Sequence, residues 1–274
     1  MTRVKLGIIV DQGHLKFKMG EFLKYAKTIA EVSIYVEQEL LFNPSELKLN
    51  EDVFLVKGKG DLLLDFVRFV ERETSAPIIN SYKGTYLTIH RFLNSLYLER
   101  AGILVPKFSL SPCHFRAPYE DYIIKNIVDK KIYSFTPRVE RVNGHVHVID
   151  QRAWDECYND KERYNYFFYQ EFIESEWEYK IYGIGEQLLF YKQVPLLYNP
   201  NKLETRHKIE KIPELEEICY KAMEVLDLKL TSIDFLRGKD GEFYLTDINC
   251  TPNFNYIKDG PKIVANFLIE QAKR

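Results

Sequence analysis

The chain has 274 residues, of which 46% are hydrophobic and 28% are charged. This composition is that of a folded protein with a sizeable apolar core, and it excludes a disordered or fibrous chain. The 38 basic and 40 acidic residues leave a net charge of −2, which argues against a nucleic-acid coat or a membrane-surface protein, because both need a strong basic field.

The chain also lacks the features of membrane and secreted proteins. No apolar run approaches the roughly 18 residues that a membrane helix needs, and the first apolar stretch lacks a signal-peptide pattern. We therefore expect a soluble, cytoplasmic protein with no nucleic-acid or membrane partner. The cysteines form no C-x-x-C pair, so we expect mostly buried thiols and neither a zinc site nor a disulfide framework. They are Cys113, Cys157, Cys219 and Cys250.

The first hundred residues alternate short apolar runs with segments of helical period, which predicts a parallel sheet covered by helices. The expected strands are residues 6–10, 32–36, 53–56 and 77–80. The expected helices are residues 20–29, 62–73 and 85–101, the last of them ended by Gly102.

From residue 103 onward strands outnumber helices, and apolar residues alternate with polar ones, which is typical of antiparallel sheets with one solvated face. The expected strands are residues 122–125, 145–150, 167–170, 179–184, 188–193, 232–237 and 243–249. The expected helices are residues 213–228 and 263–273. The Gly-Lys-Asp-Gly sequence at 238–241 predicts a hairpin between the last two strands.

The strongest chemical signal lies in this predicted hairpin. Asp234 stands in the middle of an apolar strand, and Asp247 and Asn249 stand two residues apart on its partner, so their side chains share a face. Buried carboxylates need compensation, and a small set of oxygen ligands suggests Mg²⁺ at a nucleotide-phosphate site more than a calcium site. The alternative is that these acids cap turns or pair with Arg237 and Lys239.

The end of the hairpin, Asp-Ile-Asn-x-x-Pro, resembles the metal-binding hairpin of the ATP-grasp superfamily. The most similar branch contains RimK-like ligases, glutathione-synthetase-like enzymes and inositol trisphosphate 5/6-kinases. The resemblance implies that ATP is bound with one or two Mg²⁺ ions held by Asp234, Asp247 and Asn249. Asp247 is slightly more similar to the kinases, because the ligases often have Glu at this position.

Other landmarks of the family follow in the expected order. Residues 88–106 resemble the helix that begins near a phosphate-binding Lys and ends in Ala-Gly-Ile-x-Val-Pro, with Arg91 at the Lys position. Residues 122–125 resemble the strand that presents a second phosphate-binding lysine, and residues 169–173 resemble the hinge that reads the adenine edge. The residues that the resemblance assigns to ATP are Arg91, Lys125, Gln170, Glu171, Phe172, Ile173, Glu178 and Lys180.

The resemblance covers nearly the whole chain and implies an α/β (α+β) fold of the ATP-grasp type. Three parts are expected: a small N-terminal α/β domain at 1–102, a central lobe at 103–170, and a C-terminal lobe with the metal-binding hairpin at 171–274. The two lobes would clasp ATP between antiparallel sheets. The oligomeric state stays open, with a homodimer among the alternatives.

One segment departs from the family pattern. A Gly-rich loop normally covers the phosphates, but residues 126–144 contain a single glycine, Gly144. Side chains keep backbone amides away from a phosphate. Either basic side chains replace those amides, or the loop is altered and catalysis is in doubt. The basic residues of this segment are Lys130, Lys131, Arg138 and Arg141.

Basic residues after strands are candidate substrate contacts. Lys16 and Lys18 follow the first strand, where α/β sheets bind ligands, and the kinases carry lysines there that meet substrate phosphates. The alternative is a solvated helix start. Lys57 and Lys59 follow a later strand and could line the same cleft, although a lone G-x-G is too weak a signal for a phosphate loop.

A second basic group follows the hinge. Lys192 and Arg206 match the region where the family places basic residues over the γ-phosphate or the substrate, so the resemblance implies catalytic roles for them together with Lys125. A solvated charged loop is the commoner alternative. The implied substrate contacts are Lys16, Lys18, Arg138, Arg141 and Asn253.

The implied reaction is transfer of the γ-phosphoryl group of Mg-ATP to a small-molecule or peptide acceptor. A carboxylate acceptor would give an acyl phosphate that an amine displaces, which is the C–N ligase hypothesis and our first choice. A hydroxyl acceptor would make the enzyme a small-molecule kinase, which the Asp247, Lys16 and Lys18 matches favour. Lys180 favours it as well, because the ligases tend to have Arg at this position and the kinases have Lys. A nucleotide-binding protein that has lost catalysis is the third hypothesis, favoured by the missing Gly-rich loop.

Overall fold

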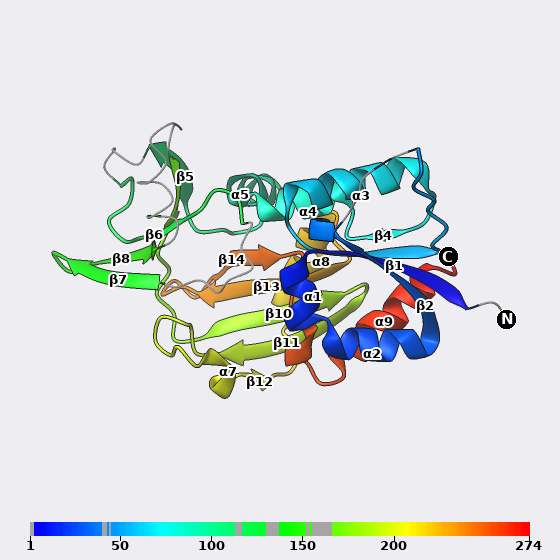
Figure 1. Cartoon of the computed structure of the whole chain (residues 1–274). Helices are drawn as coiled ribbons and strands as arrows, with labels where there is room; N and C mark the ends of the chain where they lie inside the picture. The colour runs from blue at the N-terminus through cyan, green and yellow to red at the C-terminus, as the bar shows by residue number, and fades with distance from the viewer. Residues whose placement is uncertain are drawn as a thin grey trace.

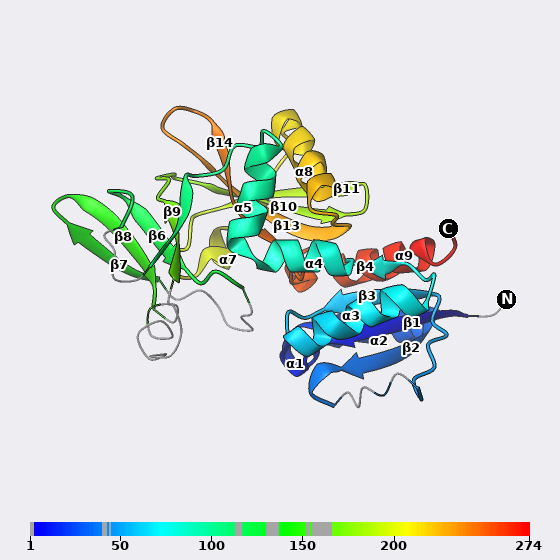
Figure 2. The ribbon, with the colours of Figure 1, turned by 90° about the horizontal axis from the view of Figure 1, so that it is seen from above.

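The computed structural model describes residues 3–39, 43, 45–112, 117–129, 137–151, 154 and 166–274. The strands in these ranges form three separate sheets that follow one another along the chain (Figures 1 and 2). The mixed α/β class predicted from the sequence is therefore confirmed. Within the same ranges, no helix has the length and apolar character needed to cross a membrane.

The N-terminal sheet has four parallel strands in the order β2-β1-β3-β4. The strands are β1 (Val4–Val10), β2 (Ala30–Val36), β3 (Val53–Lys57) and β4 (Ile78–Ile79). The helical segments of this part are α1 (Gln12–Lys18), α2 (Gly20–Ile29), η1 (Glu37–Glu39) and α3 (Asp61–Glu73). Because β2 and β3 pair on opposite sides of β1, the strand order reverses between β1 and β3, and open α/β sheets bind ligands at the carboxyl ends of such strands.

The central sheet has the order β5-β9-β6-β8-β7, and its pairs are antiparallel except for β6 with β8. The strands are β5 (Phe108–Pro112), β6 (Tyr122–Lys125), β7 (Pro137–Val142), β8 (His145–Asp150) and β9 (Tyr166–Glu171). The two edge strands, β5 and β7, were not predicted. Neither contains a fully buried residue, so neither carries the buried apolar alternation that marks a strand in a sequence.

The C-terminal sheet is antiparallel, with the order β12-β11-β10-β13-β14. Its strands are β10 (Glu178–Ile184), β11 (Gln187–Gln193), β12 (His207–Lys208), β13 (Leu230–Arg237) and β14 (Phe243–Asn249), with α7 (Lys202–Thr205) before β12. One face packs on α8 (Pro213–Val225) through Ile181, Ile233, Phe235 and Ile248. Since side chains alternate along a strand, the opposite face carries the polar residues.

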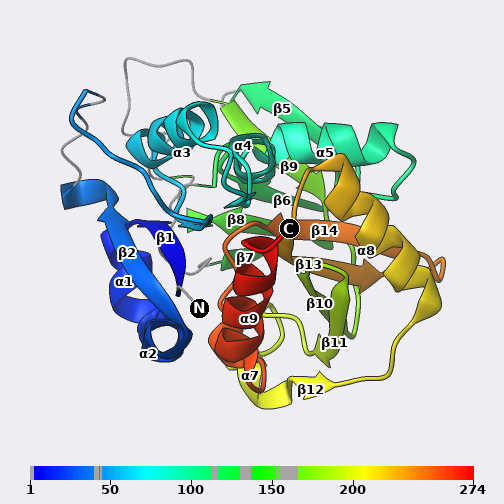
Figure 3. The same cartoon turned by 90° about the vertical axis from the view of Figure 1, so that its right-hand side faces the viewer.

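The last helix, α9 (Gly260–Gln271), follows η2 (Phe254–Tyr256) and returns to the N-terminal sheet. It packs on α2 and on strands β1 and β3, and it also contacts β10 (Figure 3). One apolar core therefore joins Leu6 and Val10 of the N-terminal sheet with Ile184 and Leu230 of the C-terminal sheet. This shared core sets the position of the N-terminal sheet relative to the predicted metal-binding hairpin.

The single helix predicted at 85–101 is wrong, because the structure has α4 (Tyr82–Ile89) and α5 (Arg91–Arg100) with His90 between them. His90 has extended dihedral angles and forms an isolated bridge with Val128. On either side of it, Asp129 N donates to Ile89 O (2.7 Å) and Arg91 N donates to Ile127 O (2.8 Å). Pairing with a segment almost 40 residues further along thus interrupts the helix, which local periodicity cannot show.

Gly84 in α4 provides a test of tertiary packing against helix propensity. A Cβ added to this glycine would lie 2.2 Å from the backbone oxygen of Asp227. Propensity alone predicts that Gly84→Ala stabilises the helix by about 1 kcal/mol, but the clash is expected to reverse the sign and cost about 1–3 kcal/mol. Urea unfolding measures the difference, with the exposed Lys83→Ala as the control in the same helix. A gain in stability for Gly84→Ala would contradict the packing.

Candidate functional site

The polar face of the C-terminal sheet gathers the predicted metal ligands. In the strand register, Asp234 stands opposite Lys180 on one side and Asp247 on the other, and Ser232 stands opposite Asn249. Ile233 and Phe235, the neighbours of Asp234 in the chain, are fully buried on the other face. The alternation of β13 therefore places both carboxylates and Asn249 together on the face that is turned away from α8.

The two carboxylates have different partners. The Asp234 carboxylate pairs with the Lys180 ammonium, and both side chains are largely buried. The Asp247 carboxylate forms no hydrogen bond or ion pair with any described residue. Like charges at opposite positions of an antiparallel pair destabilise it, so one compensated and one uncompensated carboxylate fit a bound cation.

Asn249 fits the metal less directly. Its Oδ1 accepts hydrogen bonds from Thr251 N (2.9 Å) and from Thr251 Oγ1 (3.3 Å). An amide oxygen has two lone pairs, so Asn249 would have to exchange one of these bonds to bind a cation. In the ranges that the structure describes, no group of three or more His, Cys, Asp or Glu residues is placed to hold a metal. A divalent ion at this hairpin would therefore be held by two carboxylates and an amide, with Mg²⁺ completing its octahedron with water or phosphate.

Lys180 is a permanent positive charge on this face. Burial lowers the pKa of its ammonium, but Asp234, Tyr182 and Glu178 together raise it by more, so the net pKa lies above the ordinary value. Lys180 therefore stays charged at neutral pH, and it neutralises Asp234 when no metal is bound.

Lys125 and Gln170 bring the central sheet to the same place. Lys125 Nζ donates to Gln170 Oε1 (2.8 Å) and to Thr246 O (3.4 Å), and Gln170 Nε2 donates to Thr246 O (3.3 Å). Thr246 immediately precedes Asp247, so β6 and β9 of one sheet meet β14 of the other. Burial lowers the pKa of Lys125, and the Asp247 carboxylate opposes that shift. The structure thus places a buried ammonium beside the candidate metal ligands.

Arg91 lies at the start of α5 and faces the chain after β6. Its Nη1 donates to Asn126 O (3.1 Å), and its Nη2 lies 3.5 Å from Asp129 Oδ1. Lys59 from the N-terminal part contacts the other oxygen of Asp129 (2.6 Å). Burial lowers the pKa of Lys59, but Asp129 and Cys250 together outweigh burial and the net shift is upward. Lys130 and Lys131, predicted to replace the Gly-rich loop, lie outside the described residues.

The predicted hinge offers fewer backbone donors than expected. Glu171 N donates to Lys107 O (2.8 Å), and Phe172 N donates to Asp121 O (3.1 Å). These two N–H groups are therefore engaged within the protein. No described residue accepts a hydrogen bond from the N–H of Ile173, so among Glu171, Phe172 and Ile173 it is Ile173 that has a donor available to a ligand.

The second predicted basic group lies on β11 and just before β12. Arg206 Nε donates to Gln193 Oε1 (2.6 Å), and Arg206 Nη1 donates to Tyr182 Oη (2.9 Å). Gln193 Nε2 in turn donates to Glu178. Glu178, Lys180 and Tyr182 alternate along β10, so this network lies on the face that carries Asp234. Lys192, which precedes Gln193 in the chain, points to the other face of β11. Its Nζ lies over the Trp177 ring, 4.3 Å from the ring centroid.

Arg138 and Arg141 lie on edge strand β7 of the central sheet. Arg138 pairs with Glu140 (2.9 Å) and donates to Gln151 Oε1 (2.8 Å). Arg141 instead lines a hollow of about 520 Å³ together with Lys239 of the hairpin turn. The structure therefore gives these two arginines separate surroundings, and it does not gather them at Lys125.

Lys16 and Lys18 are also separated, because residues 12–18 form helix α1 and not a loop. Lys16 is exposed, with its ammonium beside the ring of Phe17 (5.4 Å). Lys18 is half-buried and lines a small cavity with Lys57. Asn253, the remaining predicted substrate contact, caps η2 by accepting a hydrogen bond from Asn255 N (3.1 Å).

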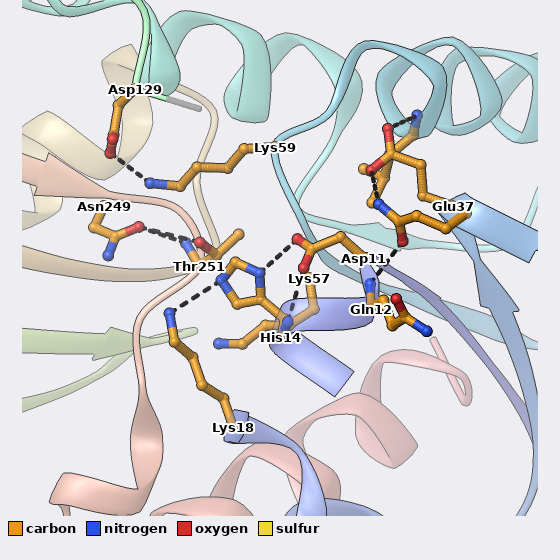
Figure 4. A network of polar contacts seen from close by, with 12 residues as sticks. Asp11, Gln12, His14, Lys18, Glu37, Lys57, Lys59, Asp129, Asn249 and Thr251 are labelled. Atoms are coloured by element: carbon orange, nitrogen blue, oxygen red, sulfur yellow. Dashed lines mark hydrogen bonds and ion pairs between the residues drawn. The ribbon is translucent and has the colours of Figure 1, made fainter. Parts of the chain in front are cut away.

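Sequence analysis missed two residues of this region, Asp11 and His14. Asp11 caps α1 with Oδ1, which accepts from His14 N (2.7 Å), and its Oδ2 lies 2.5 Å from His14 Nδ1. Figure 4 shows the His14 ring between Asp11 and Lys18, beside Lys57. An Asp just after a strand, followed three residues later by a potential partner, has the spacing of an N-cap, and this is the signal that could have found them.

Comparisons with known proteins show similarity in structure and not in sequence. The chain matches no family model and no curated protein sequence. A RiPP-associated ATP-grasp ligase from Chryseobacterium gregarium, solved with ADP and with leader and core peptide, is 14% identical with a TM-score of 0.69, and the match covers 98% of this chain and 97% of that one.

Two further solved structures are similar to the same extent. A RimK domain ATP-grasp protein from Sphaerobacter thermophilus is 13% identical with a TM-score of 0.68, covering 97% of this chain and 100% of that one. D-alanine–D-alanine ligase from Bacillus anthracis, solved with ATP, is 12% identical with a TM-score of 0.67, covering 99% and 98%. Since each match spans nearly the whole of both chains, the chain has the ATP-grasp fold that its motifs predicted.

Proposed function

We propose that the protein is an ATP-dependent ligase that activates a carboxylate as an acyl phosphate and joins it to an amine. The observation that carries the proposal is the meeting of the two sheets, where Lys125 of one sheet donates to Thr246 O of the other and lies beside Asp247. The similar solved structures support the class, because two of the three reported above are ligases, solved with ADP or ATP.

Each side chain has a part in such a reaction. Lys125 and Arg91 would neutralise phosphate oxygens in a buried setting, where charges act more strongly than in water. Asp234, Asp247 and Asn249 would hold Mg²⁺, which when bound stabilises negative charge on phosphate oxygens. A carboxylate oxygen of the acceptor attacks the γ-phosphorus and ADP leaves. The amine nitrogen then attacks the acyl carbon, inorganic phosphate leaves, and the amine loses a proton.

Hydroxylamine trapping tests this proposal directly. Incubation with Mg-ATP, pooled carboxylic acids and hydroxylamine is expected to yield a hydroxamate together with stoichiometric ADP and phosphate, because hydroxylamine intercepts an acyl phosphate in place of the amine. Omission of ATP is the negative control. A phosphorylated product without hydroxamate and without released phosphate would refute the ligase assignment.

A small-molecule kinase is the second candidate, and one observation favours it. Lys59 lowers the pKa of Lys18, and burial, followed by Lys18, lowers the pKa of Lys57 to about 7, so these three lysines lie close together. Such a cluster of ammonium groups fits an acceptor that already carries phosphate groups. The same trapping experiment separates the two candidates, since a hydroxyl acceptor forms no hydroxamate.

A further inference from the structure

We propose that Asp11, His14 and Lys18 form a relay that holds the Lys18 ammonium in place for an anionic group of the acceptor substrate. In this arrangement Lys18 is the binding group, while Asp11 and His14 are positioning residues. The inference rests on the proposed function, which supplies the acceptor, but it deepens that function by assigning a negatively charged substrate to one end of the N-terminal sheet. Of these three residues, the sequence predicted only Lys18 as a substrate contact.

The geometry of the relay leaves one arrangement of hydrogens. Both oxygens of Asp11 are engaged by His14, one with the backbone N–H and one with Nδ1. A carboxylate only accepts, so Nδ1 carries the hydrogen, and the neutral ring presents a lone pair at Nε2. Lys18 Nζ lies 3.2 Å from Nε2 and donates to it. His14 is 1% exposed, so its ring is closed off from water.

Capping of α1 does not account for these contacts. An N-cap needs one oxygen and one backbone N–H, whereas here the second oxygen fixes a buried imidazole that reaches a lysine one turn further along. Lys16 on the same helix is exposed and makes no such contact with the ring. Lys18 stands four residues after His14 and shares its helix face, so of these two lysines it is the one that the ring holds.

Electrostatics show why a relay is needed. Burial, followed by the charge of Lys59, lowers the pKa of Lys18. The pKa of Lys57 is lowered in the same way by burial and by Lys18. The opposing carboxylates are Asp11 and Asp129, which are engaged with His14 and with Lys59. An unanchored Lys18 would lower its energy by turning to solvent. Held in place, it completes a positive site after β1 and β3 that an anion would neutralise.

The relay also makes the site sensitive to acid. Burial lowers the pKa of His14 below its usual value of about 6.5; Asp11 opposes this shift, and the charges of Lys18 and Lys57 add to it. Protonation of Nε2 would remove the acceptor of Lys18 and place a second cation beside it. Anion binding through Lys18 is therefore expected to be intact at neutral pH and to weaken as the pH falls below the pKa of His14.

Inorganic phosphate is the probe for the test, used on the full-length, isotope-labelled protein with Mg-ADP present to fill the nucleotide site. In ¹⁵N NMR spectra, His14 is expected to show the Nδ1–H tautomer, and phosphate is expected to shift the Lys18 Nζ signal. His14→Gln removes the imidazole that positions the Lys18 ammonium. It should therefore weaken phosphate binding about tenfold, because the charge-assisted hydrogen bond from Lys18 to phosphate is no longer held in place. His147→Gln, on the exposed side of the central sheet, is the matched control and should bind phosphate normally.

Lys18→Gln is the control for misfolding, because this variant keeps the Asp11–His14 pair. This variant should lose phosphate binding to the same extent while the His14 tautomer is unchanged. Normal phosphate affinity in His14→Gln, or an Nε2–H tautomer in the parent protein, would overturn the relay. A failed hydroxamate assay with intact, His14-dependent phosphate binding would refute the ligase proposal alone, so the two failures are distinguishable.

Discussion

Asp247→Asn is expected to lower Mg-ATP turnover by about 10²–10³-fold, since it removes the uncompensated carboxylate of the polar sheet face. The side chains are nearly isosteric, so the fold should be retained. The amide carries no charge to offset a divalent cation, and metal-dependent ATP affinity should fall with the rate. Titration of Mg²⁺ at fixed ATP, followed by ADP release and by nucleotide binding, measures both effects.

Asp240→Asn is the matched control for this prediction. Asp240 lies in the turn of the same hairpin, where it accepts hydrogen bonds from Glu242 N (3.1 Å) and from Tyr244 Oη (2.7 Å). It is exposed and distant from the strand register of Asp234 and Asp247. Its Mg-ATP affinity should therefore match that of the parent protein. Unchanged Mg-ATP affinity in Asp247→Asn would count against the proposed metal ligands.

Asn80→Ala is expected to destabilise the protein by about 3 kcal/mol or more, because it leaves several buried backbone N–H and C=O groups without a hydrogen-bond partner. Asn80 is 2% exposed and follows β4. Its Oδ1 accepts from the N–H groups of Lys229 (2.8 Å) and Leu230 (2.9 Å), and its Nδ2 donates to Leu230 O (2.7 Å) and Cys250 O (3.0 Å). The melting temperature should fall by about 10 °C, which differential scanning calorimetry measures.

Asn266→Ala serves as the comparison for the Asn80 variant. Asn266 accepts a single exposed hydrogen bond from Tyr25 Oη (3.2 Å), so its loss is expected to cost less than about 1 kcal/mol. A similar small loss for Asn80→Ala would mean that water replaces the four hydrogen bonds. The expected contrast would instead show that Asn80 joins the N-terminal sheet to the strands that carry Asp234 and Asn249.

Most elements could be predicted because their signals are local. The strands at 122–125, 145–150 and 243–249 have the predicted boundaries, and the Gly-Lys-Asp-Gly turn closes the last hairpin with Gly241 at a φ of 88°. Alternation along β13 and β14 also placed Asp234, Asp247 and Asn249 on one face. A period of two residues is enough to decide which side chains share a sheet face.

Contacts between distant segments could not be predicted in the same way. The break at His90 depends on a bridge to Val128, and the Lys57 ammonium donates to Pro252 O, 195 residues away. Neither Val128 nor Pro252 stands in a sequence pattern that predicts such a contact. The sequence gives Lys16 and Lys18 equal standing as substrate contacts, whereas helix α1 directs their side chains to different surroundings.

The sequence by itself determined the ATP-grasp fold, through motif order, and the shared face of the two carboxylates, through strand alternation. The tertiary structure decided which basic residues belong to the candidate site. Lys125 is beside Asp247 and Lys18 is held by His14, whereas Lys16 is directed to solvent and Arg138 to Glu140 and Gln151. The physical reason is that periodicity is a property of neighbouring residues, while the surroundings of a charge depend on which distant segments the apolar core brings together.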